Sequence, residues 1–165
     1  MEVLKEKNKS EKVEIPKSLK EAMEQYQLMN VVAIADKNNP HFQSSYADLK
    51  SVIMAVKQGA KLGLTFKQEV EYKNIILKKV KTENGSVIEY QELHRDIFVR
   101  TVVEQRNDNK TSQCTVPVLV NGNDKDNPQK MGSAITYAKR YGLQSLYGLA
   151  SDDDANEASK KEISK

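Results

Sequence analysis

The sequence predicts an α+β domain in which a three-stranded antiparallel sheet packs against helices. Two segments with apolar residues at every third or fourth position come first, three segments with apolar residues at every second position follow, and a long amphipathic segment comes last. These two periods are typical of helices and strands, respectively. Strands that follow one another without an intervening helix favour hairpins and hence an antiparallel sheet. The predicted core therefore has the order β-β-β-α, preceded by two helices.

The composition predicts one domain with flexible ends. The chain has 165 residues, of which 38% are hydrophobic, and no Trp, so a core of modest size is expected. Residues 1–15 are rich in Lys, Glu and Asn and predict a flexible basic and polar N-terminal segment, while residues 152–165 predict a flexible tail of acidic to mixed charge. The domain itself is expected to span residues 16–151.

Charge, cysteine content and hydropathy exclude several classes of protein. The net charge of +3 and the pI of about 8.8 indicate a nucleic-acid partner only weakly, because a local basic surface matters more than the total. Cys114 is the one cysteine, which excludes an intrachain disulfide and a cysteine-based zinc site. Residues 1–12 do not resemble a signal peptide, and no apolar run reaches the roughly 20 residues of a membrane-spanning helix. A cytoplasmic protein without a membrane partner is expected.

The first two predicted helices are bounded by polar residues. Ser18, with Glu21 three residues later, forms a capping box, and apolar residues at helical spacing continue from there to Ala33. This helix is predicted to end before the loop rich in Asp, Asn and Pro that follows. The second helix is predicted to begin at Ser45 and to end at Gly63, a C-terminal cap. Its buried stripe comprises Leu49, Val52, Ile53, Val56 and Ala60.

Three segments in the middle of the chain alternate between apolar and polar residues, as half-buried strands do. The first covers residues 64–80 and is followed by Asn84-Gly85, a strong signal for a tight hairpin turn. The second covers residues 87–104, and the third follows a turn at residues 107–109. Since Pro117 cannot donate a backbone hydrogen bond, the third strand is predicted to lie at the edge of the sheet. The alternating apolar faces comprise Leu64, Phe66, Val70, Tyr72, Ile76 and Val80 in the first strand, Leu93, Ile97, Val99, Thr101 and Val103 in the second, and Cys114, Val116, Val118 and Val120 in the third.

A last helix is predicted from Pro128 to Tyr147. Asn127 is a favourable N-cap, Pro128 fits the first helical position, and Gly148 can close the C-terminus. The apolar stripe of this helix comprises Met131, Ala134, Ile135, Ala138 and Leu146.

This last helix carries the strongest functional indication in the residues themselves. Between residues 129 and 151 there are three basic residues and no acidic one. Lys130, the hydroxyls of Ser133 and Thr136, and the backbone N–H groups at the helix start could together hold phosphates. Tyr137 and Tyr141, four residues apart, could stack on bases or sugars. The alternative is that the basic face is simply solvated and the tyrosines serve packing, which is the more common role of such residues.

Two sequence motifs resemble those of the ERF (essential recombination function) family. One is the string from Gly132 to Leu146, GSAITYAKRYGLQSL, followed by Gly148 and by acidic residues at 152–154. The other is Pro40-His41-Phe42, followed by SYADL at residues 45–49. Because the motifs lie near opposite ends of the domain, the resemblance covers residues 16–155, nearly the whole patterned chain.

The resemblance implies a protein that binds single-stranded DNA without ATP and anneals complementary strands in phage or prophage homologous recombination. It implies no enzymatic activity and no cofactor, a location in the cytoplasm of a bacterial host cell, and a fold similar to that of the ring-forming annealing proteins. It also implies assembly into a homo-oligomeric ring or filament, and it suggests a host or phage single-strand-binding protein or exonuclease as a further partner.

The motifs and the basic helix together identify the expected DNA-binding residues. The chain departs from the family in one place: many members have lysines in the loop before the second helix, where this chain has Gln43, Ser44 and Ser45. These side chains could still hydrogen-bond a DNA backbone, and the missing positive charge is expected at Lys50 or at the hairpin residues Lys78, Lys79 and Lys81. The expected DNA-binding residues are Gln43, Ser45, Tyr46, Lys130, Ser133, Thr136, Tyr137, Lys139 and Arg140.

Three other functions can be weighed against annealing. A metal-dependent nuclease would use the acidic residues Asp152, Asp153 and Asp154 with His41 or His94, but three consecutive residues do not converge on one ion, and a solvated segment is expected instead. An ATP-driven strand-exchange enzyme is excluded, because the chain lacks a Gly-x-x-x-x-Gly-Lys-Ser/Thr loop. A single-strand-binding protein that protects DNA without annealing it stays open as the alternative function.

Overall fold

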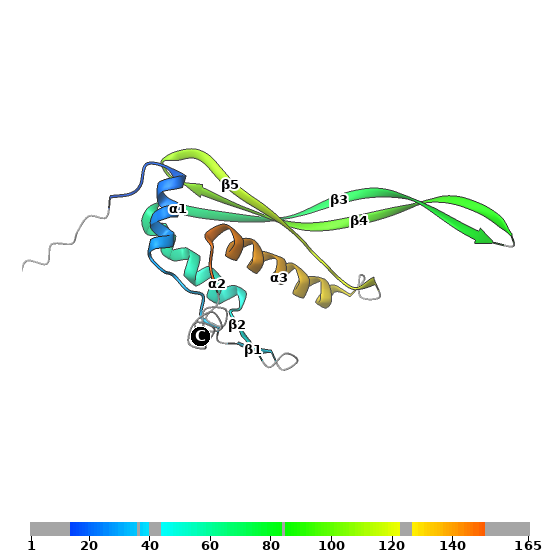
Figure 1. Cartoon of the computed structure of the whole chain (residues 1–165), viewed down its shortest axis with the longest axis horizontal. Helices are drawn as coiled ribbons and strands as arrows, with labels where there is room; N and C mark the ends of the chain where they lie inside the picture. Colours follow the sequence, from blue (N-terminus) through cyan, green and yellow to red (C-terminus); the bar gives the residue numbers. More distant parts are fainter. Residues whose placement is uncertain (1–13, 36, 40–43, 84, 123–126, 151–165) are drawn as a thin grey trace, which may run out of the picture.

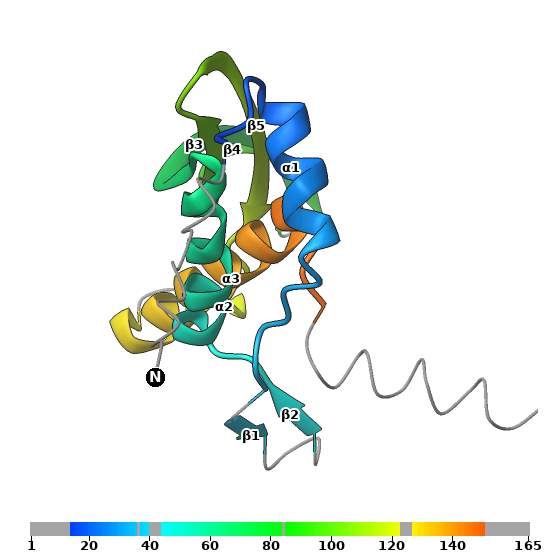
Figure 2. The ribbon, with the colours of Figure 1, turned by 90° about the vertical axis from the view of Figure 1, so that its left-hand side faces the viewer.

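A computed structural model of the chain describes residues 14–35, 37–39, 44–83, 85–122 and 127–150. Its main feature is a three-stranded antiparallel sheet with the strand order β3-β4-β5 (Figure 1). A separate two-stranded sheet, β1-β2, projects from the body below α2 (Figure 2). The strands are β1 (Lys37–Asn39), β2 (Ser44–Tyr46), β3 (Leu64–Glu83), β4 (Ser86–Gln105) and β5 (Asp108–Pro117).

The helices of the described residues lie on one face of the large sheet (Figure 2). They are α1 (Leu19–Leu28), α2 (Leu49–Val56), the short 3-10 helix η1 (Lys57–Leu62) and α3 (Pro128–Tyr147). The predicted α+β class, with its β-β-β-α core, is therefore confirmed, as are the limits of the last helix. The flexible segments 1–15 and 152–165 stay predictions, because residues 1–13 and 151–165 lie outside the described part of the chain.

β3 and β4 form one uninterrupted hairpin. They pair over all 20 residues of each strand, and residues 84–85 connect them, as predicted. Gly85 has a φ of 78°, a left-handed conformation that glycine adopts readily in a two-residue hairpin turn. Among the described residues β5 pairs only with β4, which confirms that it is an edge strand. It ends at Pro117, so the prediction that Val118 and Val120 continue the strand is wrong; a residue without an N–H group interrupts the ladder there.

Beyond the end of β5, β3 and β4 continue as a two-stranded ribbon that extends well past the helices (Figure 1). We call residues 72–83 and 85–97 of this ribbon the outer hairpin. The apolar alternation predicts a half-buried face here, and this prediction is wrong. The helices cover the sheet only near its other end, so no second layer packs against the ribbon. The residues concerned, Tyr72, Ile76, Val80 and Leu93, are 63–64% exposed.

Two helix boundaries differ from those predicted. α1 ends at Leu28 rather than continuing to Ala33, because Asn30 adopts a left-handed conformation with a φ of 50°, which breaks the helix. Ala33 is nevertheless buried in the non-helical segment that follows.

The second helix begins at Leu49 and not at Ser45, which lies in β2 opposite Asn38. Its N-cap is Asp48, whose carboxylate accepts the Ser51 N–H at 2.8 Å; this hydrogen bond lowers the pKa of Asp48. Gly63, with a φ of 77°, closes η1, the continuation of α2, and so ends this helical segment as predicted.

The hydrophobic core lies between the helices and the inner face of the sheet. Tyr26 of α1 and Tyr147 of α3 are its largest fully buried side chains, and their ring centroids are 5.0 Å apart in an edge-to-face arrangement. The Tyr26 hydroxyl donates to the Ala55 carbonyl of α2 at 3.1 Å, so this side chain joins all three α-helices. The other fully buried residues of the core include Val52, Val56, Val99, Val103 and Leu143.

Because these two phenols are buried, the free energy of unfolding depends on pH in the alkaline range. Burial raises the pKa of Tyr26 to about 12 and also raises the pKa of Tyr147. In the unfolded chain both phenols ionise near their usual pKa of about 10, so the unfolded state loses protons first as the pH rises. The free energy of unfolding should therefore be constant below about pH 9 and fall between about pH 10 and 12. Urea unfolding across this range checks it, and Tyr26→Phe should show a smaller fall; an equal fall in that variant would contradict the explanation.

Gly142 allows α3 to approach the sheet closely. A Cβ at this position would overlap the Thr101 hydroxyl and lie 3.3 Å from the Thr101 Cβ. Gln68 of β3 reinforces the contact, because its side-chain amide donates to the Lys139 carbonyl at 2.8 Å and to the Thr101 hydroxyl at 2.8 Å. These contacts determine which face of α3 points away from the sheet.

Replacing Gly142 with Ala should lower the free energy of unfolding by about 1–3 kcal/mol, the usual cost of overpacking. The matched control is Gly132→Ala in the first half of the same helix, where a Cβ meets nothing within 4 Å. That control should gain about 0.5–1 kcal/mol, because Ala is the better helix former. Urea unfolding followed by circular dichroism measures both changes. Two effects of the same sign would contradict the close approach.

Candidate nucleic-acid interface

The side chain of Asn127 caps the start of α3. The Asn127 side-chain oxygen accepts the N–H groups of Gln129 at 3.0 Å and of Lys130 at 3.2 Å, and Pro128 has no N–H group. These N–H groups are therefore not free to bind a phosphate, contrary to what the sequence predicts. The Thr136 hydroxyl donates to the Gly132 carbonyl at 2.9 Å, so its proton is also used within the helix. Any phosphate contact here must come from other side chains, of which Lys130 and Ser133 are exposed.

The outward face of α3 carries an arginine surrounded by three tyrosine rings. The central carbon of the Arg140 guanidinium lies 4.7 Å from the ring centroid of Tyr137, 5.2 Å from that of Tyr141 and 5.0 Å from that of Tyr46. At these distances the cation is attracted to each ring face. We call Tyr46, Tyr137, Arg140 and Tyr141 the aromatic–arginine cluster.

The two helix tyrosines of the cluster also contact each other. Their hydroxyl oxygens are 2.8 Å apart and their ring centroids 4.5 Å apart. This hydrogen bond raises the pKa of Tyr137, while the nearby Arg140 charge opposes the rise. Tyr137 is 56% exposed and Tyr141 42%, so both rings keep surface on which a planar ligand can stack.

The cluster joins two segments that are far apart in the sequence. The Arg140 guanidinium donates to the Ala47 carbonyl at 3.2 Å, across 93 positions of the chain. Tyr46 ends β2 and Ala47 follows it, whereas the other three residues lie on α3. The geometry therefore brings the motif at residues 45–49 into contact with the motif at residues 132–146.

A groove of about 490 Å³ runs beside the cluster, between α3 and the end of β5. Its lining is mostly apolar. The residues concerned are Val116, Pro117, Leu119, Ser133, Ala134, Tyr137 and Tyr141. One side of the tyrosine pair thus faces this groove.

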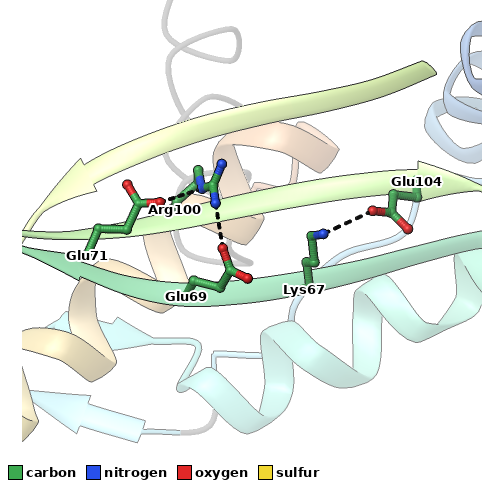
Figure 3. Close-up of polar contacts among 5 residues, drawn as sticks. All are labelled: Lys67, Glu69, Glu71, Arg100 and Glu104. Atoms are coloured by element: carbon green, nitrogen blue, oxygen red, sulfur yellow. Dashed lines mark hydrogen bonds and ion pairs between the residues drawn. The ribbon is translucent and has the colours of Figure 1, made fainter. Parts of the chain in front are cut away.

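The outer face of the large sheet carries charges that are paired with one another (Figure 3). Arg100 lies between two carboxylates, with its Nη2 2.6 Å from Glu69 Oε2 and its Nε 2.7 Å from Glu71 Oε1. Lys67 Nζ lies 3.4 Å from Glu104 Oε1. Three carboxylates around two cations leave this face unattractive to phosphates.

The hairpin lysines are also partly neutralised. Lys79 pairs with Glu92, and Lys81 Nζ lies 3.4 Å from Glu83 Oε1. The expectation that these lysines replace the charge missing from residues 43–45 therefore gains no support from the geometry. By contrast, none of Lys130, Lys139 and Arg140 pairs with a carboxylate of the described residues.

The structure brings together some of the expected site residues and leaves others apart. Tyr46, Tyr137 and Arg140 meet in the cluster, and Lys130, Ser133, Thr136 and Lys139 lie along the same helix. Ser45 precedes Tyr46 in β2, and Gln43 lies outside the described residues. Tyr141, which its spacing from Tyr137 already indicates in the sequence, also lies in the cluster. The Ala47 carbonyl is the addition, and nothing in the sequence identifies a backbone carbonyl.

Comparison with models of protein families shows to which family the chain belongs. A family model described as the ERF superfamily matches residues 13–165. The chain belongs to the ERF superfamily. This membership supports a role of the recombination or strand-annealing type, and the match covers both segments that meet in the cluster of this ERF chain. No curated protein and no solved structure matches the ERF chain.

Most residues of the alternative nuclease site lie outside the described part of this ERF chain. Residues 152–154 and His41 are not among the described residues. His94 Nε2 lies 2.9 Å from Asp96 Oδ1 on β4, and the described residues contain no group of three or more side chains suited to hold a metal ion. In the same part of the chain, no helix combines the length and the apolar character that crossing a membrane requires.

Proposed function

We propose that this ERF chain binds single-stranded DNA along the outward face of α3 and anneals complementary strands, without ATP, in phage or prophage homologous recombination. The observation that carries the proposal is the aromatic–arginine cluster. It combines exposed tyrosine rings with an arginine that pairs with no carboxylate of the described residues, and it unites both family motifs. Proteins that bind single strands without sequence preference combine the same two features.

Each part of this surface has a proposed task. The tyrosine rings stack on bases, which contributes roughly 1–3 kcal/mol for each base regardless of its identity. Arg140, Lys139 and Lys130 neutralise phosphates, and Ser133 adds a hydroxyl donor. Gln43 and Ser45 hydrogen-bond the DNA backbone in this proposal, and Tyr46 adds a third ring beside Arg140. Thr136 has a lesser part, because its proton is used within α3.

Annealing follows from holding the DNA by its backbone. One copy makes only a few phosphate contacts, so it should bind weakly and lose affinity as salt rises. A homo-oligomer repeats these contacts along one strand, and linked sites can raise the avidity by roughly 10²–10⁴. Base edges that stay accessible can test a second strand, and base pairing then supplies the free energy. No nucleotide hydrolysis is required.

The test is to mix two complementary fluorescent oligonucleotides with the protein in the presence of a chelator and without ATP. An annealing protein should accelerate duplex formation at least several-fold over the protein-free rate. Slower pairing than in the protein-free sample would identify a protein that only protects single strands, and the proposal would then be wrong. A parallel sample with Mg²⁺, analysed on a denaturing gel, should contain intact oligonucleotides. Shortened products would revive the nuclease alternative.

A further inference from the structure

The outer hairpin carries an apolar strip that no part of the described chain covers. Residues that are paired across β3 and β4 point to the same face, so Ile76 and Leu93 lie side by side. Every second residue of each strand lies on this face, where apolar residues alternate with polar ones such as Asn74, Lys78 and Arg95. Its five most exposed apolar residues, Tyr72, Ile76, Val80, Val87 and Leu93, are 63–68% exposed. The same face is covered by helices nearer the body, where Val99 and Val103 are fully buried.

A ribbon of this kind needs a partner surface. Two-stranded hairpins are marginally stable in water unless they pack against something, and exposed apolar patches mark sites of interaction. DNA does not fit the strip, because the outer hairpin is nearly neutral. It carries five basic residues and four acidic ones: Lys73, Lys78, Lys79, Lys81 and Arg95 against Glu83, Glu89, Glu92 and Asp96.

The same chain offers a second surface at the root of the hairpin, part apolar and part polar. A groove of about 750 Å³ lies where the hairpin leaves the body. Leu119, which contributes to it, is 81% exposed. Its apolar lining includes Tyr72, Leu93, Leu119, Val120 and Met131, and its polar lining includes Glu92, His94, Arg95 and Asp96. We call this the root groove.

We propose that the tip half of the outer hairpin of one copy docks in the root groove of a second copy, head to tail. The hairpin extends away from its own root (Figure 1), so its tip can reach a root groove only on another molecule. One face of the six paired positions in the tip half measures about 20 Å by 10 Å, or roughly 200 Å². This is about a quarter of the ~800 Å² that each partner contributes to a standard interface. A single contact is therefore weak. In a head-to-tail ring or filament, each copy makes two such contacts, one through its hairpin and one through its root groove.

Crosslinking tests the proposal without DNA, so its outcome is independent of annealing. In the full chain carrying Cys114→Ser, Val80→Cys places a thiol near the tip and Leu119→Cys places one in the root groove. A bismaleimide should link the double variant into a ladder of dimers, trimers and larger species, while each single variant stays mainly monomeric on a denaturing gel. Strong dimers from Val80→Cys alone would mean that two hairpins pack against each other. Links within one chain, or none in the double variant, would likewise overturn the proposal.

Substitution of the strip provides an independent test. Val80→Thr with Val87→Thr keeps β-branched side chains, so the hairpin pairing should persist while the apolar surface of the tip half is lost. Sedimentation velocity should show that this variant dissociates at protein concentrations at least tenfold higher than the parent protein. The matched control is Ile88→Thr on the opposite face of the same hairpin, which should assemble as the parent does. A parent protein that is monomeric throughout, or equal effects of the two variants, would overturn the proposal.

Discussion

Replacing Lys139 and Arg140 together with Ala should weaken binding of a single-stranded oligonucleotide about tenfold to a hundredfold at moderate salt. The double variant loses two phosphate contacts and also the cation that holds the three tyrosine rings together. A loss of about 1.4–2.8 kcal/mol corresponds to this range. Because each phosphate contact contributes about 0.7 to the salt slope on single strands, the slope should fall by about 1.4. Fluorescence anisotropy with a labelled oligonucleotide at several salt concentrations measures both quantities.

A charge-matched control separates this site from the overall charge. Lys20→Ala with Lys67→Ala also removes two positive charges, but Lys20 pairs with Glu24 on α1 and Lys67 with Glu104 on the outer face of the sheet. This control should bind the oligonucleotide nearly as the parent does. If both double variants lose affinity equally, the helix face is not the binding site. Unchanged helix content by circular dichroism must accompany the comparison, because Arg140 also donates to the Ala47 carbonyl.

Tyr147→Ala should lower the free energy of unfolding by about 3–5 kcal/mol, the usual loss when a buried aromatic side chain is removed from a core. Tyr147 is 1% exposed and packs against Tyr26, so the substitution leaves a cavity between α1 and α3. Since small domains are commonly stable by only about 5–15 kcal/mol, the variant should be partly unfolded at moderate temperature. Urea unfolding followed by circular dichroism measures the change.

The control for this core substitution is Tyr90→Ala. Tyr90 lies on the outer hairpin and is 42% exposed, so the same truncation there should change the free energy of unfolding by less than about 1 kcal/mol. Similar losses in the two variants would show that Tyr147 does not have the central place in the core that its burial indicates.

Features of the fold that depend on neighbouring residues could be predicted from the sequence. The side chain of Asn127 and the flexibility of Gly148 are sufficient to define both ends of α3, and Asn84-Gly85 defines the centre of the long hairpin. The wrong predictions concern features that depend on distant parts of the chain. The alternation of Ile76 and Val80 is the same as that of a covered strand, and only the placement of the helices leaves them exposed.

The candidate site was predictable to a similar extent. Lys130, Tyr137 and Arg140 are identified by their helix and by the family motif, but their surroundings depend on tertiary contacts. Pairing of Lys79 with Glu92 and capping of Lys130 N–H by Asn127 both remove binding groups that the sequence alone suggests. The contact between Tyr46 and Arg140 could not be predicted from the sequence, because the two residues are far apart along the chain.

The unbroken ladder between β3 and β4 has a consequence for how such proteins can change during evolution. No bulge interrupts its 20 pairs, so one residue inserted in a single strand would turn every side chain between the insertion and a compensating irregularity to the opposite face. Removing one cross-strand pair near the tip, in contrast, shortens the reach by only about 3.3 Å and leaves the body unchanged. Relatives should therefore tolerate hairpins of different length when both strands change together, while unequal changes should be rare.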